Sequence, residues 1–97
     1  MIREVILRRR AEDDVRTLLR WYETRDRALG DRFLIELRHT LEQIGQFPES
    51  GPLLHGKVRR AVVQTLPHFV FYLVEAARVV VLAVLYTSRN PAVWPRK

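Results

Sequence analysis

The spacing of apolar residues in the first half of the chain predicts one short strand followed by two helices. Residues 2–7 alternate roughly between apolar and polar and end in an apolar run, which is typical of a strand. A helical period then appears over 11–24 and again over 27–46, until Pro48 stops it. The positions on the two apolar faces are Ala11, Val15, Leu18, Leu19, Tyr22, Phe33, Leu34, Leu37, Leu41 and Ile44. Their seven-residue spacings predict an antiparallel helical hairpin with both faces in the core.

The second half of the chain has the composition of a sheet. Strand-forming residues fill three consecutive segments, 58–66, 68–75 and 78–87. Pro67 and the pair Ala76–Ala77 separate them, and connections this short join antiparallel neighbours, so we expect a meander with a slightly longer loop at the alanine pair. The element order is βααβββ. The fold class is α+β, a single domain over residues 1–97 with the helical hairpin on one face of a small, mainly antiparallel sheet.

The last two predicted strands are apolar without alternation. Residues 69–74 and 79–85 are apolar throughout, which is typical of strands that are covered on both faces. A hairpin of two helices covers one face. The other face must be covered by the C-terminal tail, by a partner protein or by a second copy of the chain, and this excess of apolar surface favours a protein that works in a complex.

The charge is distributed unevenly. The chain has 97 residues, with 17 Lys and Arg against 11 Asp and Glu, and a formal net charge of +6. Residues 1–50 hold equal numbers of basic and acidic residues, whereas residues 51–97 hold seven basic residues and the single acid Glu75. This asymmetry is typical of a surface that meets nucleic acid or an acidic partner, although a basic surface that merely aids solubility is the alternative.

Several classes of protein are excluded by residues that the sequence lacks. There is no cysteine, which excludes disulfide scaffolds, Cys-ligated zinc and thiol nucleophiles and fits a reducing compartment, so we expect a cytoplasmic protein. Charged residues interrupt the N-terminal segment, so we expect neither a signal peptide nor a membrane span. No nucleotide-binding loop, nucleophile elbow or metal motif is present, and we expect no cofactor and no metal.

The histidines and the clustered acids have structural explanations. The three histidines have no ligand spacing, and we expect each to be a surface or edge residue: His39, His55 and His68. The three consecutive acids are explained as charges at the start of a helix, where they oppose the helix dipole: Glu12, Asp13 and Asp14.

The remaining candidate residues are cations and aromatics of the second half. The candidates for binding a target molecule, such as nucleic acid or an acidic partner, are Lys57, Arg59, Arg60, Tyr86, Arg89 and Trp94. Arginine binds phosphate and carboxylate through a planar fork of donors. On one strand Arg59 and Arg60 project to opposite faces, so they cannot serve one site. Arg89 is better placed because it follows a buried strand, which would hold it at the rim of the sheet. Trp94 is expected to pack the tail onto the open sheet face, the alternative being base stacking.

Short sequence segments spread over the chain carry a family resemblance. They are Ala11-Glu-Asp-Asp-Val, Leu29-Gly-Asp-Arg-Phe-Leu, Leu41-Glu-Gln-Ile, Phe47-Pro-Glu, Val58-Arg-Arg, Pro67-His-Phe-Val-Phe-Tyr and Val80-Val-Leu-Ala-Val-Leu-Tyr-Thr-Ser-Arg. In this order and spacing, over nearly the whole chain, the sequence resembles the ParE/RelE superfamily of small bacterial toxins from type II toxin-antitoxin modules. RelE-like members are ribosome-dependent mRNA nucleases, and ParE-like members inhibit DNA gyrase.

Differences at expected site positions make the resemblance closer to ParE. RelE-like sequences carry an arginine where this chain has Phe69 and a tail tyrosine where it has Trp94, and many relatives carry a histidine where it has Tyr86. Arg89 matches the basic position after the last strand and is the one catalytic candidate. The resemblance therefore implies a toxin that binds gyrase without enzymatic activity and meets nucleic acid only indirectly.

Two further functions stay open at this point. One is a RelE-like, metal-independent mRNA endonuclease that uses Lys57, Arg59 and Arg89, and the other is an interaction module without toxicity. For a toxin, the resemblance also implies a ParD-like antitoxin as partner. Its candidate landing sites are apolar residues that the helical pattern leaves outside the core: Trp21, Leu29 and Ile35.

Overall fold

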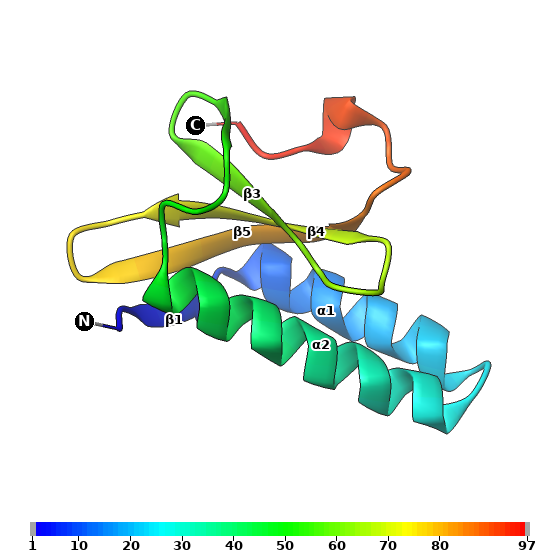
Figure 1. Ribbon diagram of the computed structural model, residues 1–97. Helices are drawn as coiled ribbons and strands as arrows, with labels where there is room; N and C mark the ends of the chain where they lie inside the picture. Colours follow the sequence, from blue (N-terminus) through cyan, green and yellow to red (C-terminus); the bar gives the residue numbers. More distant parts are fainter. Residues whose placement is uncertain (1, 97) are drawn as a thin grey trace.

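Two antiparallel helices lie across one face of a five-stranded sheet, as the computed structural model of residues 2–96 shows (Figure 1). The elements are β1 (Glu4–Leu7), α1 (Arg9–Glu23), α2 (Arg27–Gln46), β2 (Leu53–His55), β3 (Val58–Val62), β4 (His68–Val74), β5 (Arg78–Tyr86) and a short 3-10 helix (Pro91–Val93). The α+β class and the order βααβββ are confirmed, with β2 as an additional short strand.

The first and last strands of the chain pair with each other. The order of strands across the sheet is β1-β5-β4-β3-β2, with β1 parallel to β5 and the other neighbours antiparallel. The meander of β3, β4 and β5 is therefore as expected, and three residues join β4 to β5, one more than the alanine pair. The strand β2 was missed because three residues in a segment rich in Gly and Pro carry no readable period.

Some element boundaries differ from the predicted ones. Helix α1 begins at Arg9, two residues before its apolar period, and Arg8 precedes it in an extended conformation, with its N–H donating to the carbonyl oxygen of Val81 (3.0 Å). Strand β3 ends at Val62 and not at 66, because the chain turns there and Thr65 takes a positive φ of 64°. Helix α2 spans 27–46 as predicted, and the side chain of Asp26 caps it by accepting from the N–H of Ala28 (2.9 Å).

The main core lies between the helices and the sheet. Its buried residues are Ala11, Tyr22, Phe33, Leu37, Ile44, Val63, Val70, Tyr72, Val79, Val81 and Val84. The prediction that Leu34 belongs to this core is wrong, because 40% of its surface is exposed. The reason is geometric: the sheet and α1 meet α2 along the row that contains Phe33, Leu37 and Ile44, and Leu34 lies about 100° around the helix from Phe33.

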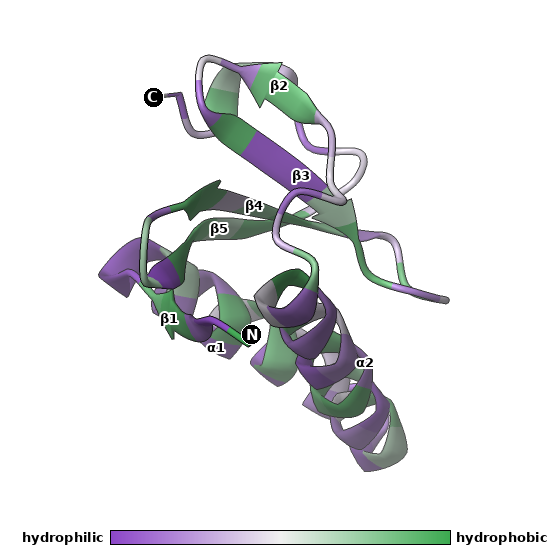
Figure 2. Cartoon of the chain, turned by 60° about the vertical axis from the view of Figure 1, so that its left-hand side comes forward, coloured by the Kyte–Doolittle hydropathy of each residue, from purple (hydrophilic) through white to green (hydrophobic). Residues whose placement is uncertain are grey.

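A second apolar cluster occupies the other face of the sheet, where the C-terminal tail crosses it. It consists of Val58, Phe71, Val80, Leu82, Ala83 and Leu85, with Val93 and Trp94 of the tail packed against it. A bulge in β5 shapes this face: Phe71 pairs with Ala83 and Tyr72 with Val81, so that Leu82 is the additional residue. The expectation that both faces of β4 and β5 are covered is confirmed, and the tail contributes to the cover. Figure 2 shows the apolar strands between these layers.

Candidate functional site

Trp94 and Arg60 hold the tail against the sheet. The Trp94 ring lies 5.3 Å from the ring of Phe71 and 6.0 Å from the ring of Phe69, measured between centroids. The guanidinium carbon of Arg60 lies 4.2 Å from the centroid of Phe69 and 5.6 Å from that of Trp94. A cation over aromatic faces adds an electrostatic attraction to the apolar packing. The prediction that Trp94 packs the tail onto the open sheet face is confirmed.

Tyr86 and Arg89 meet at the end of β5. With Asp14 they line a small hollow of about 100 Å³, and the N–H of Arg89 donates to the carbonyl oxygen of Tyr86 (3.0 Å) in the turn that follows the strand. The Arg89 side chain is exposed at this rim, as the sequence predicts, while Tyr86 is half-buried. The same turn is fixed to the neighbouring strand connection, because the N–H of Thr87 donates to the carbonyl oxygen of Pro67 (2.7 Å). A cation is thereby presented from a fixed backbone.

The Asp14 side chain binds the edge of β5. Strand β1 ends at Leu7, opposite Val81, so the later part of β5 has no partner strand on that side, and the Asp14 carboxylate accepts from the N–H of Val84 (3.0 Å). Burial raises the pKa of Asp14, against the lowering effects of this hydrogen bond and of the charges of Arg10 and Arg89. Since α1 begins at Arg9, the interpretation as a charge in the first helical turn is confirmed for Glu12 and wrong for Asp13 and Asp14, which lie in the second turn.

The guanidinium group of Arg59 is used within the fold. It donates to the carbonyl oxygens of Gly51 (2.7 Å) and Glu49 (3.2 Å), and 18% of its side chain is exposed. The neighbouring Tyr72 hydroxyl donates to the carbonyl oxygen of Pro48 (2.8 Å) and accepts from the N–H of Gly51 (3.1 Å). Arg59 and Tyr72 thus fix the segment after α2 to the sheet. As predicted, Arg59 and Arg60 serve opposite faces.

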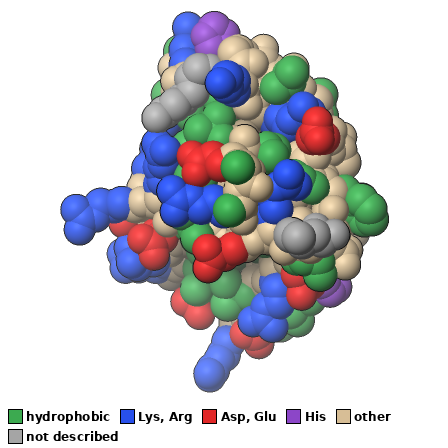
Figure 3. Space-filling model, turned by 90° about the vertical axis from the view of Figure 1, so that its left-hand side faces the viewer, with side chains coloured by type: hydrophobic (Ala, Val, Ile, Leu, Met, Phe, Trp, Pro, Cys, Tyr) green, Lys and Arg blue, Asp and Glu red, His purple; other side chains and the backbone are tan. Residues whose placement is uncertain are grey.

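Lys57 lies in the turn between β2 and β3, near the opposite end of the sheet from Arg89. It lines a groove of about 450 Å³ with Arg3, Glu49 and Glu75 among its neighbours. Figure 3 shows acidic and basic side chains mixed on this side of the molecule. The six target-binding candidates therefore fall into three places: Lys57 with Arg59, Arg60 with Trp94, and Tyr86 with Arg89.

His68 is a core residue, so the prediction that it lies at the surface or an edge is wrong. It is fully buried, its Nε2 lies 2.7 Å from the Tyr22 hydroxyl, and its ring lies edge-on to those of Tyr22 and Tyr86. Burial lowers the pKa of His68 to about 4, so the ring is neutral near pH 7. Its position at the start of an apolar strand is the one signal for burial in the sequence. Its hydrogen-bond partner Tyr22 lies 46 residues away, so no local pattern points to the pair.

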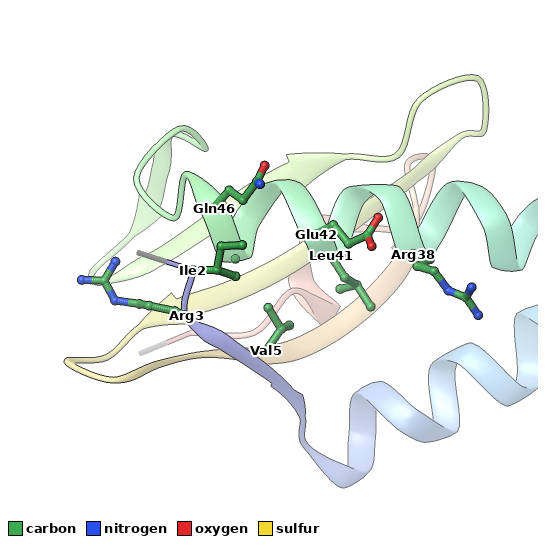
Figure 4. A pocket seen from close by; sticks show the side chains of 8 residues that line it. Ile2, Arg3, Val5, Arg38, Leu41, Glu42 and Gln46 are labelled. Atoms are coloured by element: carbon green, nitrogen blue, oxygen red, sulfur yellow. The ribbon is translucent and has the colours of Figure 1, made fainter.

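A groove between β1 and α2 was not anticipated from the sequence. It has a volume of about 530 Å³, and Ile2, Val5 and Leu41 give it an apolar floor beside Arg38 and Glu42 (Figure 4). The backbones approach closely here at Gly45, whose carbonyl oxygen accepts from the N–H of Arg3 (2.9 Å). A Cβ atom at this glycine would lie 3.1 Å from the carbonyl oxygen of Arg3 and from a methyl group of Val5.

Comparison with known proteins decides the family. Residues 5–91 match the model of the family described as ParE toxin of type II toxin-antitoxin system, parDE. The chain belongs to this family. A similar solved structure, described as the chromosomal ParDE TA system from P. aeruginosa, has a TM-score of 0.78 and 13% identity, and the match covers 90% of this chain and 98% of that one. No curated protein matches the sequence significantly.

A ParE toxin has an antitoxin as its partner, and exposed apolar side chains on the helices of this ParE toxin are candidates for that contact. Trp21 is 43% exposed and Ile35 is 54% exposed, whereas Leu29 is half-buried. The guanidinium carbon of Arg25 lies 3.5 Å from the ring centroid of Trp21, and the Trp21 and Tyr22 rings lie edge to face with their centroids 5.1 Å apart. No helix within residues 2–96 is long and apolar enough to cross a membrane.

Proposed function

We propose that this ParE toxin inhibits bacterial DNA replication in the cytoplasm by binding DNA gyrase, and that a ParD-like antitoxin neutralises it. The observation that carries the proposal is the position of Arg89. Its charge stands exposed at the end of a buried strand, beside Tyr86, on a turn that two main-chain hydrogen bonds fix. A cation on a fixed turn suits protein recognition, because the backbone that carries it does not have to be ordered on binding.

The surroundings of Phe69 favour inhibition by binding over RNA cleavage. Its ring packs against both Arg60 and Trp94, at the position where a RelE-like nuclease carries an arginine. Two nearby groups that could move a proton are engaged in the fold: His68 is buried and neutral, and the Tyr72 hydroxyl binds the segment after α2. A general acid or base must reach the reacting group, which neither side chain does from these positions.

The direct test is a titration of the purified toxin into gyrase supercoiling and DNA-cleavage assays. We expect supercoiling to stop when the toxin is in stoichiometric excess, and to recover when the antitoxin is added. Intact supercoiling at that excess would remove gyrase as the target. Cleavage of mRNA on translating ribosomes by the wild type, lost in Arg89→Ala, would support the endonuclease instead.

The antitoxin surface is tested with charge introduced on the helices. The double variant Trp21→Glu/Ile35→Glu is expected to weaken antitoxin binding by about tenfold or more, because buried tryptophan anchors dominate many interfaces. Both side chains are exposed in the free toxin, so folding and gyrase inhibition should persist. The matched control is Leu53→Glu/Val62→Glu, which changes the same charge at two side chains that are each 57% exposed. An antitoxin affinity equal to that of the wild type would place the partner on another surface.

A further inference from the structure

The start of α1 and the C-terminal tail together form a basic groove. It has a volume of about 290 Å³ and is lined by Arg8, Arg10, Leu82, Pro95 and Arg96, which we call the arginine groove. The two segments lie at opposite ends of the sequence, and a hydrogen bond from Nη2 of Arg10 to the carbonyl oxygen of Val93 (2.7 Å) joins them. The groove is therefore a built feature of the fold.

Three of the five lining residues carry a positive charge. The first half of the chain has no net charge, but its nearby acids are engaged elsewhere or only partly neutralise the groove. Asp13 pairs with Arg16 (2.8 Å). Asp14 lies 4.0 Å from Arg10 and also accepts from the backbone of β5. Arg8 and Arg96 are both exposed. Like charges held together destabilise the free protein, and a bound anion relieves that repulsion.

We propose that the arginine groove binds the phosphodiester backbone of duplex DNA, the substrate of the proposed target enzyme. This inference rests on the proposed function and adds a direct contact with nucleic acid to it. Guanidinium groups donate bidentately to phosphate oxygens, and most protein contacts with DNA go to phosphate and sugar. The lining offers Leu82 and Pro95 as apolar surface, which is little for a folding antitoxin segment, whereas the exposed large apolar side chains lie outside this groove, on the helices, on β2 and β3 and beside β1.

Simultaneous contact with gyrase and DNA has a thermodynamic consequence. Once the site around Arg89 holds the enzyme, the arginine groove meets the bound DNA as an intramolecular event, with an effective concentration far above that of free DNA. A modest affinity for phosphate then adds to the affinity of the whole complex. The toxin would bind more tightly to gyrase that is engaged with DNA than to the free enzyme.

The test compares two double variants with the same change in net charge. Arg8→Ala/Arg96→Ala removes two cations of the groove, and Arg20→Ala/Arg27→Ala removes two exposed cations at the other end of the helical hairpin. Each lowers the formal net charge of +6 by two. Arg8 makes no side-chain cap for α1, so the groove variant loses no capping bond. Thermal unfolding of all three proteins checks that the fold is retained.

Binding of a labelled DNA duplex is measured without gyrase, at salt concentrations from about 50 to about 200 mM. We expect the groove variant to bind about tenfold more weakly at low salt, with a plot of log K against log[salt] that is shallower by about two, since each lost phosphate contact lowers the slope by about 0.9. The control variant should stay within about threefold of the wild type. Equal losses in both variants, or no duplex binding by the wild type, would overturn the proposal.

Two further arms separate other occupants from DNA. If single-stranded RNA of the same length binds more tightly than the duplex and depends on the same two arginines, the ligand is RNA and the proposal of duplex DNA fails. If only antitoxin binding depends on Arg8 and Arg96, the occupant is an acidic protein segment and the proposal fails. Gyrase inhibition without duplex binding would refute the arginine groove as a DNA site and leave the proposed target intact.

Discussion

Half-maximal inhibition of gyrase by the Arg89→Ala variant is expected to need at least tenfold more protein than inhibition by the wild type. Loss of one charged hydrogen bond that is desolvated at an interface costs about 2 to 5 kcal/mol, and about 1.4 kcal/mol already corresponds to a factor of ten. The side chain is exposed at the rim of the sheet, so its removal should leave the fold intact. The measurements are the gyrase titration and the growth of cells in which the variant is induced.

Two controls make the result specific to this position. Arg89→Lys keeps the charge and removes the fork of donors, so partial activity would show that charge and geometry both contribute. Arg27→Ala removes an exposed cation from the far end of the hairpin and should behave as wild type. Truncation after Ser88 is a poorer experiment, because it also removes Trp94 from the second apolar cluster. If Arg89→Ala stops growth as effectively as the wild type, the target-binding residues lie elsewhere.

The free energy of unfolding is expected to fall by about 3 kcal/mol, because of His68, when the pH is lowered from 6.5 to about 4. Burial lowers the pKa of His68 in the folded protein to about 4, whereas the unfolded chain has the ordinary value of 6.5. Between these values the unfolded chain binds the proton and the folded protein does not. The stabilisation that the neutral, buried His68 gives to the folded protein is therefore complete above pH 6.5 and is lost as the pH falls. Below about pH 4 this residue causes no further loss.

Urea unfolding at a series of pH values measures this effect in matched variants. The double variant Tyr22→Phe/His68→Phe replaces both hydrogen-bond partners by apolar rings and should lose the added pH dependence, while His68→Phe alone leaves the Tyr22 hydroxyl without this partner and should cost about 1 to 3 kcal/mol at pH 7. The control His39→Gln changes an exposed histidine of α2 and should keep the wild-type profile. An identical pH profile in the double variant would assign the acid sensitivity to carboxylates.

The sequence was informative wherever a structural property is periodic and local. The spacing within α2 predicted its bounds, and the unbroken apolar runs of β4 and β5 predicted strands that are covered on both faces. The exposed Arg89 also followed from local order, since it comes directly after the end of a buried strand.

Residues whose environment depends on distant parts of the chain could not be placed from the sequence. The buried His68 shares a hydrogen bond with Tyr22, which lies on another element. Asp14 binds a part of β5 that is left without a partner strand because β1 is shorter than β5. The same holds for Arg8 and Arg96, which line one groove although no pattern within either segment predicts that the two segments lie together. Each of these sites is produced by tertiary packing, which a local period does not encode.

The parallel pairing of β1 with β5 also governs when a newly made molecule can fold. Strand β5 lies between β1 and β4 in the sheet, yet it is the last strand that the ribosome synthesises. Until it emerges, the first strand has no partner and the helical hairpin has little sheet to cover, and pairing of the two ends of a chain is slow because a long loop must close. Arg89 follows β5 in the sequence, so the surface that we propose for gyrase binding is in place only once β5 has paired with β1 and β4.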